Sequence, residues 1–156
     1  MSEYQVHTSW KRQPSETFTD NKYSRAHQWV FDGGAVVNAS SAPQIVPLPY
    51  SVAENVDPEE AFVASLSSCH MLFFLSIAAS HKYVVETYTD DAVGVLGKNS
   101  DGKNAMTEVR LRPLVSFSGD APSREQIEQF HHQSHELCFI ANSVTTQVLV
   151  ELQKEG

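Results

Sequence analysis

Cysteine and basic residues are both scarce in this chain. There are only two cysteines, Cys69 and Cys138, so the disulfide framework that stabilises small secreted domains is excluded. The 11 Lys and Arg residues are outnumbered by 19 Asp and Glu residues, which gives a formal net charge of -8. Because nucleic-acid binders need positive charge to neutralise phosphates, we expect no nucleic-acid partner.

Long apolar runs, repeats and flexible linkers are also lacking. The N-terminus has no apolar signal core, and the apolar run at residues 71–79 is too short to cross a bilayer. We therefore expect a cytoplasmic protein without a membrane partner. The 156 residues contain no stretch rich enough in Gly, Ser or Pro to divide them, which predicts a single domain over residues 1–156.

Turn signals and alternation predict three strand regions. A first hairpin is expected around Asp32-Gly33-Gly34, since Asp-Gly and Gly-Gly supply the positive φ angles of tight turns. Its first strand, residues 23–31, would place Arg25 on one face with aromatic side chains. The proline-rich segment 42–57 is expected to be irregular. Residues 84–98 and 104–119 predict a second hairpin, and residues 145–153 predict a last strand.

Two helices are predicted between these strands. The first begins at Asp57-Pro58, an N-cap residue followed by proline, and extends to about His81. Its second half is apolar nearly all round, which indicates a central helix. One stripe of it is expected to contain Phe62, Leu66, Cys69, Phe73 and Ile77.

The second helix lies within residues 121–138, where Ser123 and Gln126 fit a capping box. Its expected inward face contains Ile127, Phe130, Ser134 and Cys138. The order of strands, helix, strands, helix and strand predicts an α+β domain.

Both cysteines lie on the expected inner faces of helices, so we expect a contact between them. A free cysteine is most often structural, because cysteine is among the most buried residue types. A nearby positive charge lowers its pKa and makes it reactive. Arg25 would be costly to bury unless an anion, such as a thiolate or a carboxylate, met it there.

Two motifs give the chain a resemblance to a known family. The stretch DPEEAFVASLSSCH, with Glu59 ten residues before Cys69, and the stretch SHELCFIANS resemble the OsmC/Ohr family of osmotically induced and organic hydroperoxide resistance proteins. The resemblance extends from about Tyr23 to Leu152. It implies an OsmC-like fold of antiparallel sheets packed around long central helices, in an intertwined homodimer with two sites at the subunit interface.

The resemblance also implies a thiol-dependent peroxidase that acts on organic hydroperoxides. A wider substrate range that includes hydrogen peroxide stays open. Cys69 matches the cysteine that attacks the peroxide and becomes a sulfenic acid, and Cys138 matches the one that resolves it as a disulfide. No cofactor is implied. The expected partners are a small-molecule peroxide and an external dithiol reductant, for which a lipoyl protein is one candidate.

Two charged residues complete the implied catalytic set. Arg25 matches the arginine that stabilises the thiolate, with Arg12 as the alternative, and Glu59 matches the glutamate that holds the guanidinium. Ten residues of straight helix would separate Glu59 from Cys69 by ~15 Å, too far for one site within a chain. A second subunit would bring such groups together. The spacing favours Glu59 over Glu60.

One residue departs from the family pattern. Many family members have proline after the resolving cysteine, where this chain has Phe139.

Two other functions stay open at this point, metal binding and the binding of an apolar ligand. A set of His70, His135 and the two cysteines contains zinc ligand types but lacks a C-x-x-C pair. The histidines are otherwise expected to be solvated, except for one packed beside a cysteine. The other alternative is an apolar ligand bound without turnover.

An aromatic wall would favour organic over inorganic peroxides, because burial of an alkyl tail contributes ~0.8 kcal/mol per methylene. The residues expected to form that wall are Tyr23, Trp29, Phe62 and Phe139.

Overall fold

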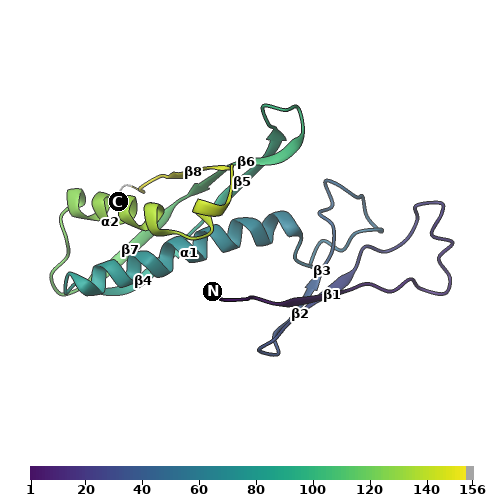
Figure 1. Ribbon diagram of the computed structural model, residues 1–156, viewed down its shortest axis with the longest axis horizontal. Coiled ribbons are helices and arrows are strands. Elements are labelled where there is room, and N and C mark those ends of the chain that lie inside the picture. The colour runs from purple at the N-terminus through teal and green to yellow at the C-terminus, as the bar shows by residue number, and fades with distance from the viewer. Residues whose placement is uncertain (154–156) are drawn as a thin grey trace. The chain divides into compact units, whose positions relative to one another are not determined.

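The computed structural model describes residues 1–153 and divides the chain into two compact units (Figure 1). The first unit is Met1–Ala61, and the second begins at Phe62. Helix α1, Pro58–Ser80, starts at the end of the first unit and continues into the second. The expectation of a single domain over residues 1–156 stays a prediction.

The first unit contains a three-stranded antiparallel sheet in the order β1-β2-β3, formed by Val6–Ser9, His27–Phe31 and Val36–Ala39. The predicted first hairpin is confirmed, because β2 pairs with β3 and the Phe31 N–H donates to the Ala35 carbonyl at 2.9 Å. Gly34 has a φ of 94°, which glycine adopts without steric cost. Strand β1 was not predicted, since all its residues are exposed and its pairing with β2 is non-local.

The expectation that residues 23–31 form one strand was wrong for its first four residues. Strand β2 begins at His27, and Arg25 lies before it. The Arg25 N–H donates instead to the carbonyl of Tyr50 at 2.8 Å, in the irregular segment that leads to α1. Asn21, shortly before, has a φ of 65°, so the chain turns where the strand was expected to begin.

Helix α1 begins at the predicted residue because its first turn is capped on both sides. The Glu60 N–H donates to Asp57 Oδ1 at 2.8 Å, and the Asp57 N–H donates to Glu60 Oε1 at 3.3 Å. This reciprocal pair satisfies two amides that have no partner within the helix. The irregular segment before it is confirmed, with the Val52 N–H donating to Ser40 Oγ at 2.9 Å.

The buried stripe of α1 is not the expected one. Leu66, His70, Phe74 and Ala78 are buried at four-residue spacing, whereas Cys69 and Phe73 are not. Because the helix is apolar nearly all round, its sequence does not select one face. Its most apolar 18 residues have a mean hydropathy of 1.8, and only 22% of them are buried. By length and composition the whole helix could cross a membrane. The expectation from the sequence considered only residues 71–79 and so underestimated the length of this apolar helix.

The second unit contains two sheets. Strand β4, Val84–Asp90, pairs with β7, Pro113–Ser118, and the other sheet has the order β5-β6-β8. Its strands are Val93–Lys98, Asn104–Leu111 and Gln147–Val150, and β8 lies parallel to β6. The predicted second hairpin is confirmed at its turn, but each of its arms breaks into two strands. The predicted last strand is confirmed as β8.

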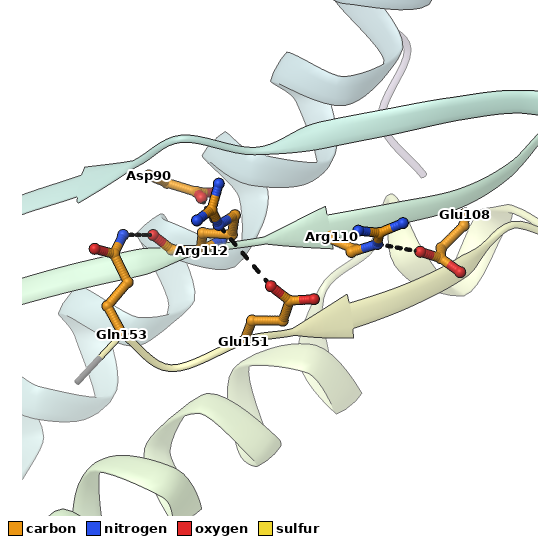
Figure 2. Close-up of polar contacts among 6 residues, drawn as sticks. All are labelled: Asp90, Glu108, Arg110, Arg112, Glu151 and Gln153. Atoms are coloured by element: carbon orange, nitrogen blue, oxygen red, sulfur yellow. Dashed lines mark hydrogen bonds and ion pairs between the residues drawn. The ribbon is translucent and has the colours of Figure 1, made fainter.

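Polar contacts fix the break in the hairpin (Figure 2). The Arg112 N–H, between β6 and β7, donates to Asp90 Oδ1 at 2.6 Å. Gln153 Nε2 donates to the Arg112 carbonyl at 2.7 Å, and the Arg112 guanidinium lies 3.9 Å from Glu151. The end of the C-terminal strand is therefore attached at the point where one sheet gives way to the other.

Helix α2, Arg124–Leu137, lies alongside α1 (Figure 1) and is followed by a short 3-10 helix, η1, at Ala141–Ser143. The predicted capping box of Ser123 and Gln126 is present. Phe130 and Cys138 are buried as predicted, and Phe130 packs with Phe74 and Ala78 of α1. The other part of α1 packs on β6, where Leu66 meets Val109 and Leu111. The predicted α+β class is thus confirmed.

Candidate active site

The two cysteines meet where the middle of α1 faces the end of α2. Cys69 is half-buried on α1, and Cys138, the C-cap of α2, is 1% exposed. Neither forms a disulfide, and their side chains lie close enough to interact, since Cys69 contributes to raising the pKa of Cys138. The expected contact between them is therefore present.

The surroundings of Cys138 affect the pKa of its thiol in two opposite directions. Burial, followed by the interaction with the nearby Cys69 side chain, raises the pKa of the Cys138 thiol to about 11. The backbone amides of Ala141 and Ile140 act in the opposite direction, and the Ala141 N–H donates to Cys138 Sγ at 3.4 Å. Cys138 is thus a thiol at neutral pH, with oriented amides in place for a thiolate.

Arg25 belongs to the first unit, where its guanidinium has local partners. It donates to the carbonyls of Tyr23 at 2.6 Å and Asn21 at 3.0 Å, and it lies 3.6 Å from the centre of the Tyr23 ring. Arg12 donates to the carbonyl of Glu16 at 2.6 Å. Within residues 1–153 neither arginine forms an ion pair. The catalytic role of Arg25, and the alternative of Arg12, stay predictions.

The two candidate glutamates differ in their surroundings. Glu60 serves the capping box of α1 with Asp57, whereas Glu59 is half-buried and takes no part in that cap. This difference supports the choice of Glu59, whose role stays a prediction. Phe139 contacts Phe73 of α1 edge to face, with ring centres 5.1 Å apart. The rest of the expected aromatic wall is not tested, because Tyr23 and Trp29 belong to the other unit.

A buried histidine pair joins α1 to α2, and one member of it, His70, directly follows Cys69 in the chain. His70 Nε2 and His131 Nδ1 are 2.9 Å apart, and the two rings are nearly parallel. Burial lowers the pKa of His70 to about 4 and that of His131 to about 3, so both are neutral at pH 7. One histidine packed beside a cysteine was expected, and His70, which follows Cys69 in the chain, is buried. The expectation of solvated histidines was wrong for His131, because α1 and α2 bury it against Phe74. It was right for His132, which is exposed.

Only His70 has a signal in the sequence, and that signal concerns burial and not pairing. His70 lies four residues after Leu66 and four before Phe74, at the spacing of the buried stripe of α1. Among the residues that the structure describes, no group of three or more His, Cys, Asp or Glu side chains is arranged to hold a metal ion. The set of His70, His135 and the two cysteines considered for zinc is therefore not assembled as a metal site.

A comparison with known protein families identifies the family of this chain. The profile of the OsmC-like protein family matches residues 52–153. The chain belongs to the OsmC-like family. The match includes Glu59 and both cysteines, and it leaves Arg25 and Arg12 outside. No curated protein matches the chain.

Solved structures of OsmC-like proteins agree with the fold. One from Vibrio cholerae, of unknown function, is 62% identical with a TM-score of 0.96, and the match covers 98% of this chain and 100% of that one. The organic hydroperoxide resistance protein OhrB of Bacillus subtilis is 16% identical over 97% of this chain and 98% of its own, with a TM-score of 0.64. An organic hydroperoxide resistance protein of Legionella pneumophila is 16% identical over 97% of both chains, with a TM-score of 0.66. The last two show that the OsmC-like fold is shared.

Proposed function

We propose that this OsmC-like protein is a thiol-dependent peroxidase for organic hydroperoxides, with Cys69 as the attacking and Cys138 as the resolving residue. The observation that supports this most is the interaction of two free thiols of unequal burial, one from α1 and one at the end of α2. Cys69 is the more accessible thiol. Cys138 is buried and protonated, as suits a group that acts only in the second step.

Three steps make up the proposed cycle. The Cys69 thiolate attacks the terminal peroxide oxygen, so an S–O bond forms, the O–O bond breaks, and the alkoxide takes a proton and leaves as an alcohol. The Cys138 thiolate then attacks the sulfenic sulfur; the S–S bond forms and hydroxide leaves to become water. An external dithiol reduces the disulfide by two exchanges and is itself oxidised to a disulfide.

We also propose that the protein is a homodimer and that the second copy covers α1. The helix leaves Leu72 60% exposed and has most of its apolar window uncovered. A soluble partner is favoured over lipid because His70, in the middle of this helix, is hydrogen-bonded to α2 of its own chain. The implied meeting of Glu59, Arg25 and Cys69 would then use both subunits.

The proposed activity is tested by the consumption of cumene hydroperoxide and of hydrogen peroxide, with dihydrolipoamide as the reductant. We expect turnover with cumene hydroperoxide, and a lower rate with hydrogen peroxide because it has no apolar part to bury. Monothiol glutathione serves as the control reductant. Failure to consume either peroxide with any dithiol would refute the proposal.

A further inference from the structure

His135 lies next to the resolving cysteine and has no assigned task. It precedes Cys138 by three residues on α2, a spacing that puts two side chains on neighbouring positions of a helix surface, with Cβ atoms about 5–6 Å apart. Its ring is half-buried, and its Nδ1 atom is fully buried without a hydrogen-bond partner in the described part of the chain. A polar atom buried in this way needs a function or a partner.

The ring also borders a hollow of about 460 Å³ between α2 and β8. The β8 side of this hollow is apolar, formed by Val148, Leu149 and Val150. One edge of His135 is therefore buried in the protein, while the residue also lines a hollow at the surface. This is a suitable position for a group that gains and loses a proton.

The second step of the proposed cycle requires a base. The Cys138 thiol has to ionise before it can attack, yet burial and the nearby Cys69 raise its pKa. The Ala141 N–H already donates a hydrogen bond to the sulfur, and the same bond would stabilise the thiolate. What the site still lacks is a group that accepts the proton.

The other titratable groups near this hollow are engaged elsewhere. On α2, Glu128 pairs with Arg124 at 3.3 Å and Glu136 with His132 at 3.2 Å. From α1, His70 faces His135, since the charge of His135 contributes to lowering the pKa of His70.

His70 and His131 hydrogen-bond each other, and burial makes both of them poor bases. Among these titratable side chains of the second unit, His135 is thus the one that remains for proton transfer to and from Cys138.

We propose that His135 is the base that takes the proton of Cys138 and then returns it to the hydroxide that leaves Cys69. This inference rests on the proposed peroxidase function. His135 accepts the thiol proton as the Cys138 thiolate attacks, the S–S bond forms and the S–O bond breaks. The imidazolium then gives that proton to the leaving hydroxide, which departs as water, so no proton is gained or lost overall.

The test separates the two chemical steps in single-turnover experiments with one equivalent of cumene hydroperoxide. Dimedone capture and mass spectrometry follow the Cys69 sulfenic acid, and a thiol count follows the disulfide. In His135→Gln the sulfenic acid should form at the wild-type rate and convert to the disulfide about 100-fold more slowly, the usual effect of losing a general base. His132→Gln is the matched control, because it removes an exposed histidine from the same helix, and it should behave like the wild type.

Two further readouts distinguish proton transfer from a structural effect. The wild-type rate of disulfide formation should fall on acidification, with the same midpoint that NMR measures for the His135 ring, and His135→Gln should lack that dependence. In His135→Ala, added imidazole should enter the hollow and restore at least a tenth of the lost rate.

Disulfide formation at the wild-type rate and with an unchanged pH profile in His135→Gln would overturn the inference and leave the peroxidase proposal standing. Loss of rate without rescue by imidazole and with an unchanged pH profile would also overturn it. If the wild type forms no sulfenic acid at all, the peroxidase proposal itself fails, and the role of His135 fails with it.

Discussion

At the scale of single residues, the two thiols are chemically unequal although they interact with each other. Cys69 is accessible and Cys138 is sealed, with its proton held by burial. A reagent needs access, whereas a resolving thiol needs only to reach the sulfur beside it.

Substitution of each cysteine should therefore give a different defect. Cys69→Ser should abolish peroxide consumption, because no thiolate remains to attack. Cys138→Ser should consume one equivalent and accumulate a sulfenic acid that further peroxide overoxidises. The measurement is peroxide consumed per subunit, together with the mass of the oxidised protein. Full multiple turnover in both variants would show that neither thiol is the reagent.

The histidine pair should make stability depend on pH in a defined direction. Burial holds the pKa of His70 at about 4 and that of His131 at about 3, below the ordinary value of 6.5, so the unfolded chain binds more protons below pH 6.5. The contribution is fully present above pH 6.5 and is lost as the pH falls toward 4 for His70 and toward 3 for His131, by up to roughly 1.4 kcal/mol per pH unit for each histidine.

Urea unfolding between pH 4.5 and 8 measures this dependence. A His70→Leu/His131→Leu double variant is the control, because carboxylates that titrate in the same range are common to both proteins. The wild type should lose more stability than the double variant between pH 6.5 and 4.5. Parallel curves for the two proteins would mean that the pair is not held neutral.

The cysteines were found from sequence alone because each lies in a local motif, whereas the histidine pair was not. His70 and His131 are 61 residues apart, and no local pattern relates them. Their contact exists only because α1 and α2 pack against each other.

At the scale of elements, the packing of α1 on β5 depends on a residue without a side chain. A Cβ atom at Gly94 would lie 2.4 Å from the Val63 side chain and 2.7 Å from Met106. The closeness of α1 to this sheet is therefore set at β5.

Gly94→Ala should destabilise the protein by about 1–3 kcal/mol, as overpacking in a core does. Gly33→Ala is the control, since a Cβ atom there would meet nothing within 4 Å. Denaturant unfolding of both variants gives the comparison. Equal stabilities would show that α1 shifts at little cost.

The starts of both helices followed from local chemistry, and the sheet pairing of the second unit did not. Both helix starts were predictable because Asp57 and Ser123 carry capping signals. The break of the second hairpin at Asp90 and Arg112 was not predictable, since it depends on one carboxylate accepting a hydrogen bond from a backbone amide 22 residues away. The parallel pairing of β8 with β6 was likewise outside the reach of a strand-by-strand reading.

At the scale of the whole molecule, helix α1 is the feature that indicates a partner. Its apolar surface is larger than one chain covers, and Leu72 is 60% exposed on it. Exposed apolar surface of this kind marks an interaction site. The proposed partner is a second copy of the chain.

Sedimentation equilibrium should therefore give a mass of twice 17.3 kDa. Leu72→Glu should convert the protein to a monomer and remove most of the peroxidase activity, because the implied site needs both subunits. Val84→Glu, at a residue exposed to a similar extent on β4, should leave the mass unchanged. A fully active wild-type monomer of 17.3 kDa would contradict the shared site.

The order of α1 in the chain has a consequence for synthesis on the ribosome. The helix is complete at Ser80, but the residues that bury it come later: Val109 and Leu111 against Leu66, and Phe130 against Phe74. A nascent chain thus carries its most apolar helix without cover until most of the remaining sequence has been translated. Such a segment is a target for chaperones and a source of aggregation, so slow translation after residue 80 lengthens the period of greatest risk for this protein.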